Sequence, residues 1–318
     1  MKKAIFLVLL LALLVPPCLA EVSDSGYRYA DAQEAAEMLL GNRDYYGSMN
    51  QNDLNCRMQK TDATLAELEA FAAAQTLDFT DAERACIDRS MNMIREICDA
   101  RGYALPPLDG IVFAKTTMAE EPGAVAYTHG KQIYLGQSLL SRATSDNPKA
   151  QARFNAMMAH ELFHCLTRYH PDFRAAMYDI LGFTVVEDDY NLGQDVRDVM
   201  ISNPDVAHHN ACATFDIDGR PTDCVVVFAF RAPFSRPGDL FDYGVTGLVP
   251  VDDLDTLYTA EDAANFWDVF GKNTNYVIDP EETLADNFAY TLIYGINGRK
   301  YATPEIIEAI DRRLKAGF

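Results

Sequence analysis

The 318-residue chain is poor in positive charge, with 27 Lys and Arg side chains against 47 Asp and Glu side chains and a formal net charge of −20. Such a surface repels nucleic acid and anionic membranes, so neither is expected as a partner. Long apolar runs are missing after the first twenty residues, which argues against a membrane span in the rest of the chain. No C-x-x-C pair occurs, which disfavours a cysteine zinc site and a thioredoxin-like function.

The first twenty residues have the order of a secretory signal peptide. Two lysines precede the apolar run 4–15, and Ala20 offers a small residue for cleavage. The run is too short for a permanent membrane helix, and Pro17 stands where a small residue should precede a lipidated Cys18. We therefore expect an exported protein, secreted or periplasmic. Without the leader, 25 of the 27 basic side chains remain and the net charge is about −22.

Six cysteines follow the leader, and an even number in an exported chain favours disulfides. Cys212 and Cys224 are symmetric about a turn at 218–219, so a hairpin would place them opposite each other. Cys86 and Cys98 cannot pair because about 18 Å of helix separates them. If the predicted helices that begin near Thr61 and Thr80 fold back as an antiparallel pair, Cys56 comes opposite Cys98. The predicted bridges are Cys56–Cys98, Cys86–Cys165 and Cys212–Cys224.

The clearest chemical signal is the H-E-x-x-H pattern from His160 to His164. Apolar residues recur three and four apart around it, which predicts an α-helix with one buried stripe. The two histidines then lie one turn apart and can bind one zinc ion, with Glu161 placed as a general base toward the water that zinc activates. The pattern also arises by chance, in which case the chain would be an exported helical protein with a structural function.

A second helix is predicted to begin at Asp279-Pro280, and it carries two acids one turn apart, Glu282 and Asp286. At this spacing the two carboxylates share one helical face, as a metal ligand and a supporting acid require. A capping box explains Glu282 as well, since Asp279 is an N-cap candidate and Glu282 is the third helical residue. From these residues alone both interpretations stay open.

Together the two segments resemble the gluzincin clan of zinc metallopeptidases, in which H-E-x-x-H supplies two ligands and a downstream E-x-x-A-D or E-x-x-x-D helix supplies the third. The resemblance implies that His160, His164 and Glu282 bind one Zn²⁺ per chain. It also implies that Glu161 is the general base and that Asp286 holds a ligand histidine. The expected reaction is hydrolysis of a peptide bond in a peptide or protein substrate.

A β-hairpin is predicted just before the H-E-x-x-H helix, from strands at 124–128 and 132–135. Its position resembles the thermolysin-like arrangement, in which an edge strand pairs with an extended substrate. Unpaired backbone groups at a sheet edge bind a peptide largely independently of its side chains. By this resemblance the substrate strand consists of Ala124, Val125, Ala126 and Tyr127.

The sequence departs from the thermolysin pattern in two respects. More than a hundred residues separate His164 from Glu282, and no histidine follows Glu282 to stabilise the negative charge of the transition state. A solvated histidine pair and buried tyrosines are candidates for that function, although each also has an ordinary structural explanation. The candidates are His208, His209, Tyr290 and Tyr294.

Two acidic pairs are candidates for a second metal. Asp188-Asp189 and Asp252-Asp253 could hold calcium, but solvated acidic loops are commoner than calcium sites. The segment 231–275 around the second pair is predicted to be loop-rich because it contains several Pro and Gly residues.

The predicted fold is α+β. Residues 1–20 form the signal peptide, and 21–107 are expected to be helical throughout, as a cap or prodomain-like cover. Residues 108–318 are expected to form a zincin-like catalytic domain, with a small mixed sheet, its edge strand and the active-site helix. A non-catalytic binding protein on the same fold is the alternative, but it could dispense with Glu161, so the presence of this residue favours an enzyme.

Overall fold

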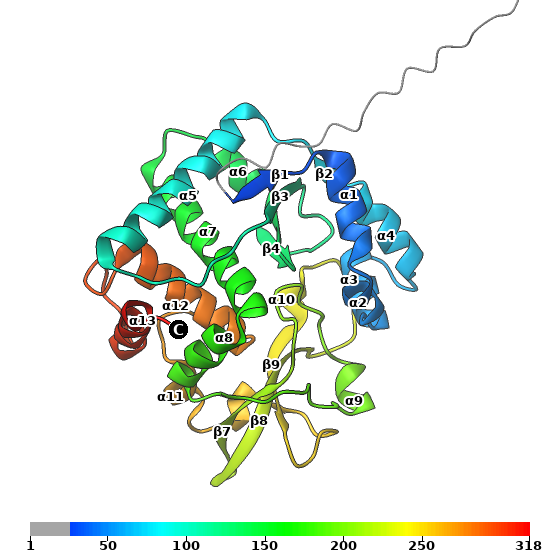
Figure 1. The fold of residues 1–318 in the computed structure, drawn as a ribbon. Coiled ribbons are helices and arrows are strands. Elements are labelled where there is room, and N and C mark those ends of the chain that lie inside the picture. The colour runs from blue at the N-terminus through cyan, green and yellow to red at the C-terminus, as the bar shows by residue number, and fades with distance from the viewer. Residues whose placement is uncertain (1–25) are drawn as a thin grey trace, which may run out of the picture.

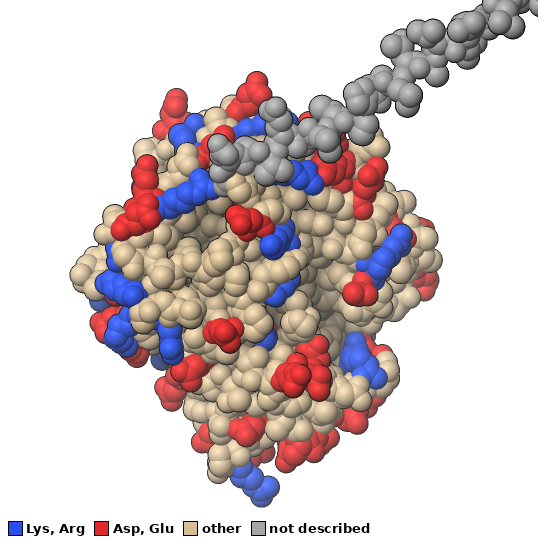
Figure 2. All heavy atoms as spheres, in the orientation of Figure 1, with Lys and Arg blue, Asp and Glu red and all other residues tan. Residues whose placement is uncertain are grey.

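The computed structural model describes residues 26–318, in which helices cover one β-sheet and a second β-sheet forms the lower end of the molecule (Figure 1). The α+β class predicted from the sequence is confirmed. The predicted signal peptide, residues 1–20, lies outside the described residues. Within 26–318 no helix is both long and apolar enough to cross a membrane. Lys, Arg, Asp and Glu side chains are interspersed over the face shown in Figure 2.

The α-helices are α1 (Ala32–Gly41), α2 (Arg43–Gly47), α3 (Gln51–Met58), α4 (Leu65–Ala73), α5 (Asp81–Arg101), α6 (Gln137–Ala143), α7 (Pro148–Tyr169), α8 (Pro171–Tyr178), α9 (Gln194–Arg197), α10 (Leu240–Tyr243), α11 (Phe266–Phe270), α12 (Pro280–Tyr294) and α13 (Pro304–Ala316). Short 3-10 turns are η1 (Asp179–Leu181) and η2 (Ala260–Asp262). The strands are β1 (Tyr27–Tyr29), β2 (Thr76–Leu77), β3 (Ile111–Thr116), β4 (Ala126–His129), β5 (Gln132–Gly136), β6 (Thr184–Val185), β7 (Ala211–Ile217), β8 (Arg220–Phe230), β9 (Gly244–Pro250) and β10 (Tyr258–Thr259).

The first sheet is mixed and has the order β1-β3-β5-β4, with β2 also pairing with β3. β1 and β5 run parallel to β3, whereas β4 runs antiparallel to β5 and forms the predicted hairpin with it. β4 begins at Ala126 rather than at 124, because the Ala124 N–H donates to the Glu121 carbonyl in a turn. Among the described strands β4 has one partner, so its outer side is a sheet edge.

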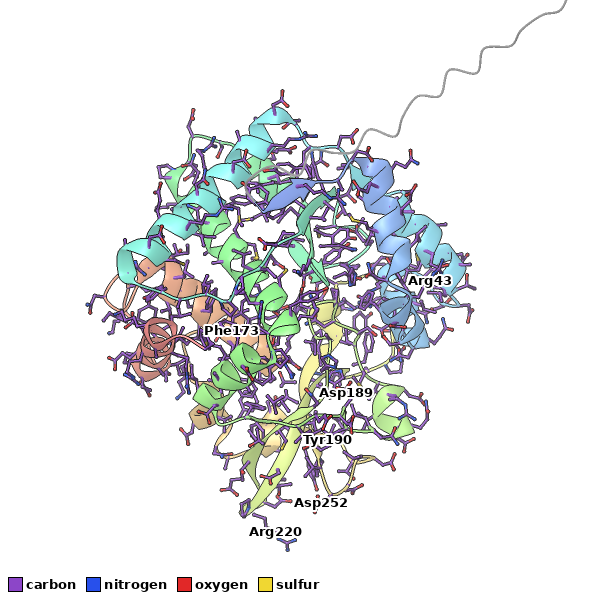
Figure 3. All side chains as sticks on the ribbon, viewed as in Figure 1. Arg43, Phe173, Asp189, Tyr190, Arg220 and Asp252 are labelled. Atoms are coloured by element: carbon purple, nitrogen blue, oxygen red, sulfur yellow. The ribbon has the colours of Figure 1, made fainter. Side chains whose placement is uncertain are left out.

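The second sheet is antiparallel, with the order β10-β9-β8-β7-β6. β7 and β8 form the long hairpin at the lower end of the molecule, with Arg220 labelled near its tip (Figures 1 and 3). The turn residues Asp218 and Gly219 have φ of 54° and 74°. Two such residues give the two-residue turn whose twist matches that of the strands.

The segment 231–275, which was expected to be loop-rich, also contains the regular strand β9, which pairs with β8 along its whole length. Its glycines conceal the strand in the sequence, because glycine weakens strand patterns but permits close approach. A Cβ on Gly244 would lie 2.1 Å from the Phe228 ring, and one on Gly247 would lie 2.6 Å from Leu257. Tertiary packing therefore requires both glycines.

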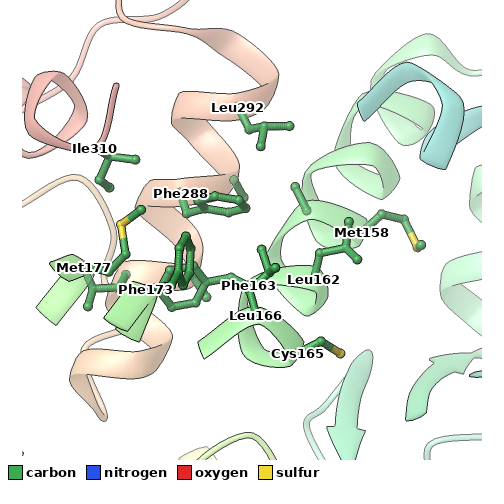
Figure 4. Packing of buried hydrophobic residues seen from close by; sticks show 14 of the residues in the cluster. Met158, Leu162, Phe163, Cys165, Leu166, Phe173, Met177, Phe288, Leu292 and Ile310 are labelled. Atoms are coloured by element: carbon green, nitrogen blue, oxygen red, sulfur yellow. The ribbon is translucent and has the colours of Figure 1, made fainter. Parts of the chain in front are cut away.

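The main hydrophobic core lies where α7, α8 and α12 meet (Figure 4). A cluster of three rings contains one fully buried phenylalanine from each helix, with 5.3–6.3 Å between the ring centroids. These residues are Phe163, Phe173 and Phe288. Aromatic pairs at such distances contribute roughly 0.5–1.5 kcal/mol beyond the burial of their area. The cluster therefore fixes α7 against α12.

The N-terminal region is not helical throughout, so that expectation is wrong in two places. Segments 27–29 and 76–77 form β1 and β2, which both pair with β3. Strands of two or three residues are too short to show a period of two in the sequence. Ile87 and Ile94 of α5 also belong to the core that α7 occupies. The boundary at 107 stays a prediction, but the main core extends across it.

The predicted disulfides are wrong, because all six cysteines within 26–318 are free thiols. In the β7–β8 hairpin Cys212 pairs with Val225, and Cys224 pairs with Ala213. The two cysteines therefore point to opposite faces of the sheet. The register is centred between the two turn residues rather than on the first, and a slip of one residue turns each side chain to the other face.

The other two predicted bridges are not formed either. Cys56 lies in an apolar cluster with Phe228, whereas Cys98 lies in the main core. Cys86 and Cys165 are both in the main core, and the Cys86 thiol donates to the Ala143 carbonyl at 3.6 Å. Those predictions assumed that α4 and α5 pack as an antiparallel pair, but the two helices do not pack along each other.

A buried arginine on α3 joins three distant segments. Arg57 forms ion pairs with Asp53 at 2.7 Å and with Glu121 at 2.9 Å, and its side chain is fully buried. Its Nη2 also donates to the Ser202 carbonyl and to the Tyr45 hydroxyl, both at 2.7 Å. The planar guanidinium is suited to such multiple contacts.

Arg57→Leu should destabilise the fold by about 3–5 kcal/mol, because it leaves Asp53 and Glu121 buried without their cation. The free energy of unfolding in urea measures the effect. Arg43→Leu is the matched control, since the Arg43 side chain is 68% exposed and pairs with Glu69 at the surface. Its loss should cost about 0–1 kcal/mol. A comparably small effect for Arg57→Leu would contradict the importance of this contact.

Candidate metal centre

Both histidines of the H-E-x-x-H pattern lie on the buried side of α7, as the helical pattern predicted. The Asn147 side chain caps the helix start by accepting from the Lys149 N–H. The rings of His160 and His164 are one turn apart, with 4.7 Å between their centroids. Both side chains are buried, at 6% and 0% exposure.

α12 brings Glu282 to the two histidines. Its Oε2 lies 3.1 Å from His160 Nε2 and 3.4 Å from His164 Nε2. Its Oε1 accepts from the Asn203 amide at 2.6 Å. The helix start is capped instead by Asp279, whose side chain accepts a backbone N–H. Glu282 therefore lies with the histidines rather than completing a capping box.

The second nitrogen of each histidine faces another acid. His160 Nδ1 lies 3.0 Å from Asp286 Oδ1, and His164 Nδ1 lies 3.1 Å from Glu281 Oε1. A proton on each Nδ1 leaves the Nε2 lone pair directed at the centre. The structure thus brings Asp286 to the centre, together with Glu281, which sequence reasoning missed. The E-x-x-x-D spacing singles out Glu282 and offers no sign that its neighbour has a function.

The electrostatics of the cluster favour positive charge at its centre. Burial lowers the pKa of His160, but hydrogen bonds with Asp286 and Glu282 outweigh it and raise that pKa to about 10. Burial raises the pKa of Glu282, but the neighbouring imidazoles hold it well below its usual range. Burial and the Asp205 carboxylate raise the pKa of Glu161 to about 8. The carboxylates thus stabilise cationic partners.

Two buried atoms at this centre have no partner in hydrogen-bond geometry within the described chain, His164 Nε2 and Glu161 Oε2. Buried polar atoms are nearly always satisfied. Ligand atoms of His160, His164 and Glu282 lie within 4.8 Å of one another, close enough to hold one metal ion. Two imidazoles and a carboxylate are the donors that zinc takes in catalytic sites, so these residues fit a zinc ion.

Asp205 was also missed by sequence reasoning. Its carboxylate lies within 4.8 Å of ligand atoms of Glu161 and His164. Asp205 Oδ1 accepts from the Thr128 N–H at 2.6 Å and from the Thr128 hydroxyl at 2.7 Å. Its own N–H donates to the Asn203 side chain, which is a local turn contact. The residues Asn203-Pro204-Asp205 could have indicated that turn, but not its contact with β4.

A cavity of about 170 Å³ opens onto the centre and connects it with the sheet edge. His160, Glu161 and Glu282 line one part of it. The predicted substrate strand lines another part, with Ala124, Val125, Ala126 and Tyr127. The structure therefore places the predicted metal ligands and the predicted substrate strand, which are distant in the sequence, around one space.

The four candidates for stabilising negative charge lie outside this cavity, although His208 lines a smaller one that also touches His164. His208 is exposed, and its Nδ1 lies 3.1 Å from the Asp189 carboxylate. His209 is half-buried, and burial of its ring lowers its pKa to about 4. Tyr290 and Tyr294 lie against the Arg299 guanidinium. None of these four residues is among those that line the cavity.

Tyr276 is a tyrosine that does line the cavity. Its ring is nearly parallel to that of His160, with 6.2 Å between the centroids. Burial and the Glu282 carboxylate raise the pKa of Tyr276 well above its usual range, so its hydroxyl keeps the proton and can donate it in a hydrogen bond. No motif marks this residue, because it lies in the loop before α12.

The two acidic pairs considered for calcium lie at separate places in the lower half of Figure 3, where Asp189 and Asp252 are labelled. Asp189 faces His208, with 3.1 Å between Oδ2 and Nδ1. Within 26–318, two groups of at least three His, Cys, Asp or Glu side chains can hold a metal ion, and both contain His164. The described side chains therefore offer calcium no cluster at either pair.

Comparisons with known proteins assign no family to the chain. No family model, no curated protein and no solved structure matches it. The interpretation of the centre therefore depends on its own geometry.

Proposed function

We propose that this chain is a zinc-dependent peptidase in which Glu161 is the general base. The observation that supports it most is the Glu161 carboxylate, whose Oε2 is buried without a partner beside the His160, His164 and Glu282 cluster. This carboxylate also lines the cavity. A buried polar atom without a partner is costly, and a catalytic function accounts for its presence.

His160, His164 and Glu282 are the residues that would hold the zinc ion. When bound, zinc lowers the pKa of a water molecule and polarises a carbonyl group. Glu161 takes a proton from the attacking water and passes it to the leaving amine. Tyr276 donates a hydrogen bond toward the oxygen on which negative charge develops. Tyr276 thus has the function for which the sequence suggested four residues that do not line the cavity.

Asp286 and Glu281 keep the two ligand histidines in one tautomer. Each carboxylate faces an Nδ1 atom, and the Tyr178 hydroxyl donates to Glu281 Oε2 at 2.7 Å. Such partners fix the orientation of the ring and raise its basicity.

β4 supplies the edge on which an extended peptide would bind. The Gly136 N–H donates to the Val125 carbonyl at 3.0 Å, so residue 125 faces β5. Backbone groups alternate along an antiparallel strand, which turns the N–H of Ala126 outward. Thr128 faces outward too, but its N–H already donates to Asp205. Ala126 therefore offers a free backbone donor at the cavity.

We expect one tightly bound zinc ion per purified chain. His160→Ala, His164→Ala and Glu282→Ala should each abolish it, because each removes a ligand. Metal analysis by mass spectrometry measures the zinc content. His208→Ala is the control and should keep its zinc, since this exposed residue is not part of the ligand cluster. Full occupancy in Glu282→Ala would remove that residue from the ligand set, and a zinc-free wild type would favour a structural protein.

Glu161→Gln should keep its zinc but lose hydrolysis by at least about 100-fold, because an amide cannot accept the proton of water. Initial rates on a peptide mixture, with and without a chelator, measure the loss. Activity within about tenfold of wild type would reject Glu161 as the general base. Zinc binding without any hydrolysis in the wild type would point to the non-catalytic binding protein.

Ala126→Pro should lower kcat/KM on extended peptides while leaving zinc content unchanged, because it removes the outward N–H. Ala126→Ser is the matched control, since it keeps that N–H. Val125→Pro and Tyr127→Pro alter residues that face β5, so they should weaken the sheet itself. If folded Ala126→Pro retains wild-type peptide kinetics, the substrate does not pair with β4.

A further inference from the structure

The loop between α9 and β7 contacts the metal centre through the side chain of Asn203. Its Nδ2 donates to Glu282 Oε1 at 2.6 Å, and the same side chain lines the cavity. Glu282 is fully buried, and its other oxygen, Oε2, lies 3.1 Å from His160 Nε2 and 3.4 Å from His164 Nε2. The two oxygens of this carboxylate therefore have different surroundings, because one faces an amide and the other faces the two histidines.

We propose that Asn203 is a positioning residue for the third zinc ligand, and that it occupies Glu282 Oε1 so that Oε2 is the single oxygen offered to the metal. The assignment rests on the proposed zinc-dependent function. A carboxylate can bind a metal ion through one oxygen or through both. A catalytic zinc ion has three protein ligands and an open fourth position. A donor held on Oε1 favours binding through one oxygen, which keeps that position open.

The contacts of Asn203 require an amide. Its Oδ1 accepts from the Asp205 N–H at 3.0 Å, while its Nδ2 donates to Glu282. The contact with Asp205 fixes the orientation of the amide, because a backbone N–H must face the oxygen rather than the nitrogen. A carboxylate at this position would have two acceptor oxygens and would direct one of them at Glu282. Aspartate would therefore keep the shape of the side chain but turn an attraction into a repulsion.

The backbone around Asn203 is held by two helices. On the α3 side, Arg57 Nη2 donates to the Ser202 carbonyl at 2.7 Å. On the α7 side, Arg168 Nη2 donates to the Pro204 carbonyl at 3.1 Å. Pro204 also restricts the backbone conformation of the residue before it. These contacts fix the loop without the help of Glu282, so the amide is already in place for the ligand that it positions.

The test compares the zinc affinity of the full chain with that of its Asn203 variants, by competition with a chelator of known affinity and without any substrate. Asn203→Ala should bind zinc about 10- to 100-fold more weakly, which is the range for partners of metal ligands. Asn203→Leu has a similar shape but no donor, so it should lose as much affinity as Asn203→Ala. Asn203→Asp should lose more than either, because its carboxylate repels that of Glu282.

Asn55 provides the matched controls. It is 8% exposed, and its side chain accepts from the Ala63 N–H at a place outside the cavity. Asn55→Ala and Asn55→Leu should lower the free energy of unfolding in urea, because the Ala63 N–H loses its acceptor, but they should leave zinc affinity unchanged. The same unfolding measurement shows whether each Asn203 variant is folded. If Asn203→Asp is not folded, the Ala and Leu variants decide the outcome.

Wild-type zinc affinity in Asn203→Ala would overturn the positioning role and leave the peptidase function intact. Affinity that is lost in Asn203→Ala but retained in Asn203→Leu or Asn203→Asp would overturn it as well, since the side chain then only fills space. If the wild type binds zinc but cleaves no peptide, the peptidase function fails, and the same affinities still decide the positioning role. A wild type that binds no zinc would overturn both.

Discussion

The burial of several carboxylates around two histidines is the constraint on which this arrangement depends. Glu161, Glu281, Glu282 and Asp205 are each less than 9% exposed, and like charges in so poorly solvated a place repel one another. Hydrogen bonds from neighbouring amide, hydroxyl and imidazole groups offset part of that cost. The aromatic packing between α7 and α12 holds the two helices together against the repulsion that these hydrogen bonds do not offset. A cation at the centre removes the repulsion at its source, which links the energetics of the fold to the chemistry proposed for it.

Local patterns in the sequence predicted the parts of the site that lie on single elements. Helical periodicity placed His160 and His164 on one face of α7, and the cap signals located the start of α12 with Glu282. Glu281 was not predicted because its partner His164 lies on another helix, and because two adjacent acids in the first turn of a helix cannot be told apart from the sequence. Tyr276 was not predicted because it lies in a loop, where no periodic sequence pattern indicates the direction of a side chain.

The errors about strands have a similar origin. β9 was missed because its glycines are there for close packing against Phe228 and Leu257, and this contact is not visible in a linear pattern. The disulfide between Cys212 and Cys224 failed because a turn motif locates a hairpin but leaves its register open by one residue. The local turn signal located the hairpin correctly. Neither β9 nor the register of the hairpin could be read from local composition, because both depend on contacts between strands.

The N-terminal helices show the limit of assigning function from motifs alone. They carry no chemical motif, which favoured a cap or removable cover. Yet Arg57 pairs with Glu121 and donates to the Ser202 carbonyl, and both of these residues line the cavity. Removal of α3 would leave a buried carboxylate unpaired in one wall and a carbonyl without its donor in the other. Because both residues line the cavity, the contacts make α3 part of the structure that shapes it.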